Sequence, residues 1–226
     1  MSTPRLLAVR EPPSAEGVVI LVHGGANRRG QVMVSPAQLS VLRMIPVARR
    51  IARRGSNRLA VYRLLNSYRG WDTSHTPVHD ITWALEQVVA RHGAQVPVCL
   101  VGHSLGGRAA ILASGLPGVR SVVALAAFVY AADADGLGLR DRQYLFVHGL
   151  KDRIAPVRRA RELADRLARA NQVGFIEIRN GKHAMLAGHR TFERAATDYV
   201  LATLLGTQAG PPVAQAMSRP GVVEVD

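Results

Sequence analysis

The stretch Val98–Ala113, VCLVGHSLGGRAAILA, decides the fold of this chain. An apolar run, Val98–Val101, leads into Gly-His-Ser-Leu-Gly and then into small and apolar residues of helical character. Glycine on both sides of Ser104 allows a tight bend without a Cβ clash, so that the hydroxyl stands above the end of a sheet. The pattern predicts a strand, a sharp turn and a helix, which is the setting of a serine nucleophile. The alternative is an ordinary turn with an incidental serine, since so short a pattern is common by chance.

The composition is that of an ordinary globular protein. Of 226 residues, 48% are hydrophobic and 20% are charged, which suffices for a core without disulfides or metals. Cys99 is the only cysteine, which excludes a disulfide framework and a thiolate zinc site, and its apolar strand predicts a small buried side chain. The N-terminal sequence MSTPRLLAVREPPS has no signal-peptide pattern, and no apolar run reaches membrane-spanning length. We therefore expect a cytoplasmic protein without a membrane span.

The formal charge of +13 at pH 7 comes almost entirely from arginine, because Lys151 and Lys182 are the only lysines. A basic surface attracts nucleic acids, anionic membranes or acidic substrates. The arginines are scattered, however, and their densest clusters, within 49–54 and 158–161, fall on amphipathic helical patterns typical of solvated faces. No nucleic-acid-binding motif accompanies them, so we expect no nucleic-acid partner.

Strand and helix patterns alternate along the chain. The alternation predicts an α/β fold, with a mostly parallel sheet, helices on both faces and ligand sites beyond the C-terminal ends of the strands. We expect residues 1–205 to form a single domain and residues 206–226, rich in Gly, Pro, Ala and Gln, to form a flexible tail. The predicted strands are 6–9, 18–22, 59–64, 96–101, 119–128, 144–147 and 175–178, and the predicted helices are 36–54, bent or interrupted at Pro46, then 76–92, one directly after Ser104, 157–170 and 189–205.

A candidate acid follows the strand at 144–147. Asp152 lies in the loop after this strand, between a glycine turn and a proline that fix the loop. Its alternative role is to cap the next helix or to pair with a neighbouring basic residue. The rival acids are Asp133 and Asp135, which lie in the loop after the preceding strand.

A candidate base, His183, directly follows the last predicted strand. A histidine there can take the Ser104 proton with one ring nitrogen while Asp152 holds the proton on the other. The chain order of serine, acid and histidine is the one expected for a nucleophile elbow. The alternative interpretation is a histidine in a surface loop.

The sequence HGGAN begins at His23 and follows the strand at 18–22. Two backbone N–H groups, one from Leu105 and one from this loop, are placed to bind a developing negative oxygen. Gly25 is the predicted second donor, and Ala26 is the alternative. We expect His23 to hold the loop by hydrogen bonding rather than to transfer protons.

These motifs together resemble the α/β-hydrolase superfamily, and in particular its small bacterial members, over roughly residues 17–205. The resemblance implies that Ser104 is the nucleophile, Asp152 the orienting acid and His183 the base. The motifs that carry it are HGG at 23–25, GHSLG at 102–106, HG at 148–149 with Asp152, and GKH at 181–183.

Many members of the superfamily carry a lid where this chain has only residues 129–143. We therefore expect no sizeable cap, an open and shallow pocket, and an esterase for modest acyl groups rather than an interfacially activated lipase. The residues expected to bind substrate are Ala26, Tyr68, Trp71, His103 and Met185, with Arg28, Arg29 and Arg69 also shaping the pocket.

The sequence thus predicts a carboxylesterase-like serine hydrolase that acts on a small acyl substrate through an acyl-enzyme. The alternatives are a thioesterase for acyl-CoA or carrier-bound acyl groups, and a hydrolase-like scaffold with a binding or non-hydrolytic role. We expect no cofactor and no metal, because His75 and His79 share a helix face without an evident third ligand. The acyl group and the oligomeric state stay open.

Overall fold

An eight-stranded sheet forms the centre of the computed structural model, which describes residues 3–25, 32–135, 137, 140–218 and 221–226. The strands are β1 (Arg5–Arg10), β2 (Gly17–Val22), β3 (Leu59–Leu65), β4 (Val98–His103), β5 (Val119–Leu125), β6 (Gln143–Gly149), β7 (Gln172–Ile178) and β8 (Val222–Val225). Their order is β1-β3-β2-β4-β5-β6-β7-β8. Only the β1–β3 pair is antiparallel among these neighbours, which confirms the predicted mostly parallel sheet.

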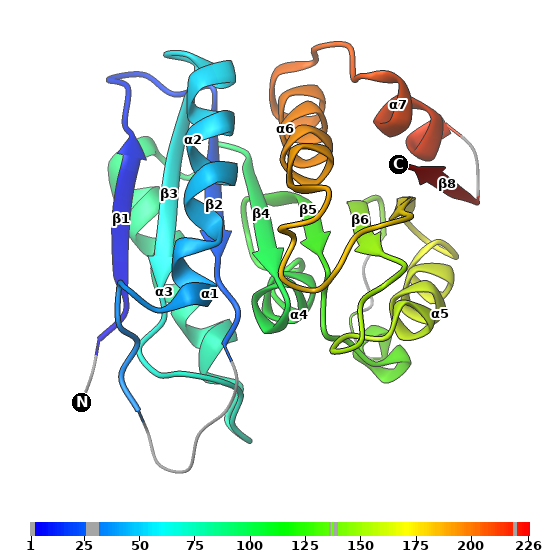
Figure 1. Cartoon of the computed structure of the whole chain (residues 1–226). Coiled ribbons are helices and arrows are strands. Elements are labelled where there is room, and N and C mark those ends of the chain that lie inside the picture. The colour runs from blue at the N-terminus through cyan, green and yellow to red at the C-terminus, as the bar shows by residue number, and fades with distance from the viewer. Residues whose placement is uncertain (1–2, 26–31, 136, 138–139, 219–220) are drawn as a thin grey trace.

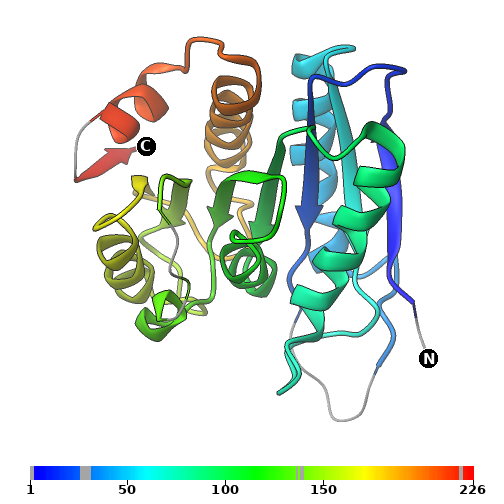
Figure 2. The same cartoon turned by 180° about the vertical axis from the view of Figure 1, so that it is seen from behind.

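Helices cover both faces of the sheet, as predicted. One face packs against α2, α6 and α7, and the other packs against α3, α4 and α5. Figure 1 shows the first three helices in front of the strands or beside them. Figure 2, the view from behind, has α3 in front. Because side chains alternate along a strand, Val18 and Ile20 enter one core and Val19 and Leu21 the other. The helices are α1 (Leu39–Leu42), α2 (Met44–Gly55), α3 (Thr76–His92), α4 (Leu105–Leu112), α5 (Val157–Leu167), α6 (His189–Leu205) and α7 (Pro211–Ser218), with the 3-10 helix η1 (Ala131–Ala134).

The predicted helix 36–54 is interrupted at Arg43, between α1 and α2, and not at Pro46. Pro46 lies in the first turn of α2. An N–H group in the first turn has no intrahelical acceptor, so proline costs little there and does not break the helix.

The segment after residue 205 differs from the predicted flexible tail. It contains α7 and β8, and β8 pairs in parallel with β7. Val213 and Ala216 are buried on the α6 side of the sheet. These two apolar positions lie three residues apart on one helix face, and this local pattern outweighs the Gly- and Pro-rich composition on which the prediction rested.

No sizeable cap interrupts the sheet. Between β5 and β6 the described residues contain a single short element, η1. The arrows of β4, β5 and β6 point to the same edge in Figure 1, and the loops that follow them meet there. None of the described helices is long and apolar enough to cross a membrane.

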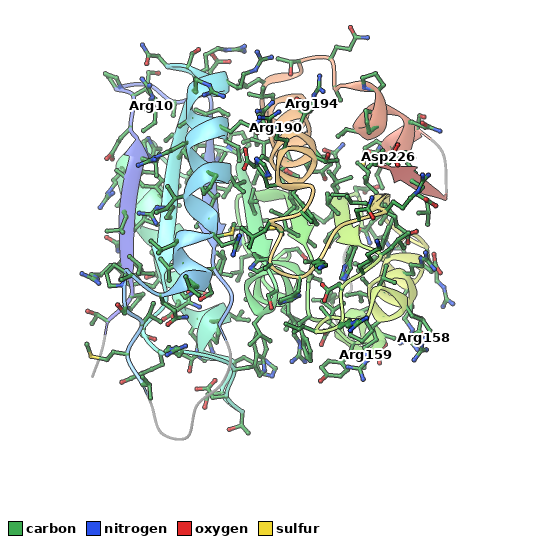
Figure 3. The ribbon with its side chains drawn as sticks, in the orientation of Figure 1. Arg10, Arg158, Arg159, Arg190, Arg194 and Asp226 are labelled. Atoms are coloured by element: carbon green, nitrogen blue, oxygen red, sulfur yellow. The ribbon has the colours of Figure 1, made fainter. Side chains whose placement is uncertain are left out.

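Positive charge is spread over several elements of the described surface. Figure 3 labels Arg10 at the end of β1, Arg158 and Arg159 on α5, and Arg190 and Arg194 on α6, and these side chains lie at separate places around the molecule. At these labelled positions the positive charge lies on three separate elements of the fold.

Candidate active site

Ser104 occupies the sharp turn between β4 and α4. Its backbone angles, φ 56° and ψ −123°, are ones that residues with a side chain rarely adopt. A Cβ on Gly102 would overlap the backbone of Gly106, and one on Gly106 would overlap the carbonyl of Val22. Glycine is therefore required at both positions for α4 to approach the sheet this closely. The turn has the geometry of a nucleophile elbow.

The structure brings Ser104, His183 and Asp152 together at the C-terminal edge of the sheet. Nε2 of His183 lies 3.0 Å from Oγ of Ser104, and Nδ1 of His183 lies 2.9 Å from Oδ2 of Asp152. With its proton on Nδ1, the ring donates to the carboxylate and leaves Nε2 free to accept from the serine hydroxyl. The three residues follow three different strands, β4, β6 and β7, as the sequence predicts.

Asp152 is held as a buried carboxylate. Its Oδ1 accepts hydrogen bonds from the N–H groups of Ile154 at 2.8 Å and Ala155 at 2.9 Å. Burial alone would raise the pKa of Asp152, but hydrogen bonds from His148, His183 and the two amides outweigh it and hold this pKa well below its usual range. The side chain is therefore ionised at neutral pH and orients the ring of His183.

The rival acids lie elsewhere. Asp133 forms a two-pronged ion pair with Arg108, with N–O distances of 2.8 to 3.1 Å, and accepts a hydrogen bond from the N–H of Tyr130. Asp135 pairs with Arg166 on the surface. Neither acid is hydrogen-bonded to His183, so among the candidates Asp152 alone has the geometry of an orienting acid.

The two predicted oxyanion donors, Gly25 and Leu105, border the same pocket as Ser104. Leu105 is the first residue of α4, where a backbone N–H has no intrahelical acceptor. Gly24 lets the β2 loop approach the serine, because a Cβ there would lie 2.8 Å from Cβ of Ser104. Ala26, the alternative donor, lies outside the described residues.

His23 ties this loop to the next strand. Its Nδ1 lies 2.6 Å from the carbonyl oxygen of Gly24, and its Nε2 accepts a hydrogen bond of 3.2 Å from the N–H of Asn66, directly after β3. Burial lowers the pKa of His23, which keeps the ring neutral. Its contacts are those of a residue that fixes the loop.

His148 is a residue of the site whose part the sequence analysis missed. The side chain is fully buried at the end of β6, with Nε2 at 2.8 Å from the carbonyl oxygen of Ala155 and 3.4 Å from Oδ2 of Asp152. Its Nδ1 has no hydrogen-bond partner among the described residues. In the sequence, His148 is the histidine of the HG pair that precedes the Asp152 loop. That pair served only as part of the family motif.

A pocket of about 490 Å³ opens in front of Ser104. Of the predicted substrate-binding residues, His103 borders this pocket, whereas Tyr68, Trp71 and Met185 do not. Arg28 and Arg29, like Ala26, lie outside the described residues, and Arg69 is not among the lining residues. The residues that line the pocket are Gly25, Leu39, Ser40, Arg43, His103, Ser104, Leu105, Phe128, Ile154, His183 and Ala184.

Trp71, Tyr68 and Met185, which do not border the pocket, make other contacts. The Arg108 guanidinium stacks on the ring of Trp71, 4.4 Å from its centre, which holds the tryptophan over α4. Tyr68 forms a β-bridge with Met33, and Met185 is buried beside a neighbouring pocket. The structure therefore places these three residues outside the lining of the Ser104 pocket, and their part in substrate binding stays a prediction. Among the described residues, no group of three His, Cys, Asp or Glu side chains could hold a metal ion.

The fold and this arrangement of strand ends define the chain as an α/β hydrolase. The sequence pattern of the Alpha/beta hydrolase family matches residues 19–224, and the chain belongs to that family. This confirms the resemblance inferred from the motifs. No curated protein matches the sequence significantly.

Several solved structures have a similar fold at low sequence identity. ATU1826 from Agrobacterium tumefaciens has a TM-score of 0.67 and 17% identity, covering 92% of this chain and 94% of its own. Est1E from Butyrivibrio proteoclasticus, also solved with ferulic acid bound, has a TM-score of 0.64 and 14% identity, with 90% and 94% covered. XC6422 from Xanthomonas campestris, described as an α/β serine hydrolase without a lid, has a TM-score of 0.63 and 16% identity, with 92% and 90% covered.

Proposed function

We propose that this protein is a serine hydrolase that cleaves small ester-type substrates through an acyl-enzyme intermediate. The observation that carries the proposal is the hydrogen-bonded series from Asp152 through His183 to Ser104, which opens on the pocket. A serine hydroxyl is a weak nucleophile until a neighbouring base accepts its proton, and this series supplies the base and the group that orients it.

In the proposed mechanism, His183 accepts the Ser104 proton through Nε2 as the serine oxygen attacks the ester carbonyl. The carboxylate of Asp152 stabilises the imidazolium that forms. His183 then gives the proton to the leaving alcohol, and an acyl-enzyme remains on Ser104. Water, deprotonated by the same histidine, attacks the acyl-enzyme, and the acid product and free Ser104 are released.

The amides of Leu105 and Gly25 are the proposed oxyanion donors. A tetrahedral intermediate places negative charge on the former carbonyl oxygen, and preorganised N–H groups lower the energy of that charge. Two features support this role: the position of Leu105 at the start of α4 and the place of Gly25 in the pocket lining.

The pocket is open along its apolar wall. Leu39 and Ile154, which line it, are 76% and 61% exposed, so the apolar wall is open to solvent. An open site without a cap needs no lipid surface to uncover it. We therefore expect activity on esters to show no jump at the critical micelle concentration of the substrate.

The proposal is tested by labelling with a fluorophosphonate, which reacts with activated serines. We expect mass spectrometry to locate one adduct on Ser104, and Ser104→Ala to abolish it. Ser40→Ala is the matched control, because Ser40 lines the same pocket and is not part of the hydrogen-bonded series. An unlabelled Ser104 in folded protein would refute an activated nucleophile and favour a binding or non-hydrolytic role. Matched esters and acyl-CoA thioesters of one acyl group then separate esterase from thioesterase activity.

A further inference from the structure

Arg43 is a cation in an otherwise apolar part of the pocket. It lies between α1 and α2 and borders the same pocket as Ser104 and His183. It is the single lysine or arginine among the described lining residues, which include no aspartate or glutamate. The neighbouring side chains of the lining are mainly apolar: Leu39, Leu105, Phe128, Ile154 and Ala184.

The Arg43 backbone N–H donates a hydrogen bond to the carbonyl oxygen of Leu39, but no hydrogen bond or ion pair joins its side chain to any residue in the described part of the chain. Two other half-buried arginines have acidic partners: Arg108 pairs with Asp133, and Arg161 pairs with Glu177. Burial lowers the pKa of Arg63, on β3, but this residue does not line the pocket. Partial burial lowers the pKa of Arg43 without an opposing contribution from an acid. The guanidinium has thus lost part of its hydration and gained no fixed counter-charge.

The groups that surround Arg43 do not neutralise it. The buried carboxylate of Asp152 is fully engaged by His183, His148 and two backbone amides. Burial lowers the pKa of His103 to about 4, so that this ring is neutral at pH 7. Glu193 borders an adjoining pocket of about 250 Å³ that Arg43 also lines, but the two form no ion pair. The pocket therefore presents net positive charge to a ligand.

We propose that Arg43 binds an anionic group of the substrate, so that the esters cleaved at Ser104 carry a carboxylate or phosphate beside a short apolar segment. This inference rests on the proposed function. A guanidinium binds such groups through two parallel, charge-assisted hydrogen bonds, which fix orientation as well as add affinity. A neutral alkyl chain in the same place would cover the cation without pairing it, at a cost in desolvation.

The anion can belong to the acyl chain or to the leaving group, and three esters distinguish these sources. The neutral reference is 4-nitrophenyl pentanoate. The 4-nitrophenyl monoester of glutaric acid has the same five-carbon chain with a terminal carboxylate. The third ester, 3-carboxy-4-nitrophenyl pentanoate, carries the carboxylate on the leaving group instead. We expect wild-type protein to prefer one of the two anionic esters over the neutral one in kcat/KM.

The variants are Arg43→Gln, Arg43→Lys and the matched control Arg49→Gln. Arg49 is exposed on α2, the helix that begins directly after Arg43, and does not line the pocket, so its loss changes the net charge equally. We expect Arg43→Gln to lower the ratio of kcat/KM for the preferred anionic ester to that for the neutral ester by roughly 10- to 100-fold. Arg43→Lys should recover part of the ratio, and Arg49→Gln should leave it within about twofold of wild type.

Three results would overturn the inference. The first is that wild type prefers neither anionic ester, and the second is that Arg43→Gln lowers kcat/KM equally on charged and neutral esters. The third is that Arg49→Gln lowers the ratio of kcat/KM values as much as Arg43→Gln does. Failure of the proposed hydrolysis is recognised separately, because then no ester turns over and the fluorophosphonate does not label Ser104. In that case calorimetry with monomethyl glutarate tests Arg43 alone. Binding to Ser104→Ala protein that Arg43→Gln removes would support the anion site, and its absence would refute it.

Discussion

Replacing Ser104 by glycine should stabilise the protein relative to replacing it by alanine. Both variants lose the hydroxyl and its hydrogen bond to His183, so their difference reports only the effects of the Cβ, of which backbone strain is one. At φ 56° and ψ −123°, a residue with a Cβ is strained and glycine is not. Such strain costs about 1–3 kcal/mol, and this conformation, favourable only for glycine, belongs near the upper end of that range.

Two effects oppose the gain. Ser104 is only 8% exposed, so losing its Cβ removes about 0.8 kcal/mol of apolar burial. Glycine also makes the unfolded chain more flexible, which costs about 0.4–1 kcal/mol relative to alanine. The net expectation is that Ser104→Gly exceeds Ser104→Ala by about 1 kcal/mol in free energy of unfolding, or about 2–4 °C in Tm.

A second serine provides the control for this measurement. Ser56, exposed directly after α2, has nearly the same backbone angles, φ 49° and ψ −131°, and does not line the pocket. Because Ser56 has no buried Cβ to lose, the free energy of unfolding of Ser56→Gly should exceed that of Ser56→Ala by about 2 kcal/mol. Urea unfolding of the four variants gives both differences. A gain at position 56 with a loss at position 104 would refute the reasoning that the elbow stores backbone strain.

Three further outcomes are expected. Asp152→Asn should lower kcat by roughly 10³- to 10⁴-fold with little change in folding, because the amide no longer holds the His183 proton on Nδ1; steady-state kinetics on a small ester check this. The free energy of unfolding should fall as pH drops from about 6.5 to about 4, with His103 contributing up to about 3 kcal/mol of the decrease. In this range the histidine of the unfolded chain binds a proton, whereas the buried His103, with its pKa of about 4, does not. Burial also lowers the pKa of His23, which therefore contributes in the same direction. Denaturant titrations of His103→Gln should show a free energy of unfolding that depends less steeply on pH than that of wild type, but that still depends on pH. Removal of residues 206–226 should lower Tm, because it uncovers the edge of β7 and the apolar surface beneath Val213, and a thermal melt that does not change would contradict the contacts of β8.

The elbow and the meeting of three strand ends at one edge of the sheet were predictable from the sequence. A Cβ at Gly102 or Gly106 meets backbone within a few residues or in the adjacent strand, so the sequence motif and the steric requirement coincide. Parallel strands end at one edge of the sheet, which brings side chains that follow β4, β6 and β7 together wherever they lie in the sequence. The geometry around Ser104 follows from these two facts.

The pocket lining was not predictable in the same way because it depends on distant packing. Trp71 lies in a loop that appears free in the sequence, yet Arg108, on α4, holds its ring. Arg43 looks like one more arginine on an amphipathic helix, and only the packing of α1 and α2 beside the serine puts it in the pocket. After residue 205 the Gly- and Pro-rich composition favours a flexible tail, whereas Val213 and Ala216 of α7 are buried in the core on the α6 side of the sheet.

Unfavourable local features gather at one end of the sheet. Ser104 has a strained backbone, Asp152 is a buried charge, and His148 has a buried nitrogen without a partner among the described residues. In the same part of the structure, Arg43 is a partly dehydrated cation that forms no ion pair with the described residues. The two large apolar cores on either side of the sheet can offset the cost of these features in stability, but the packing of the cores does not depend on them. Single features of this kind occur elsewhere, such as the backbone angles of Ser56 and the buried hydroxyl of Tyr199 without a partner among the described residues. Here four of them lie close together, and a fold under selection for stability alone would remove them one by one. Their proximity at this pocket therefore supports the proposal that the pocket performs chemistry.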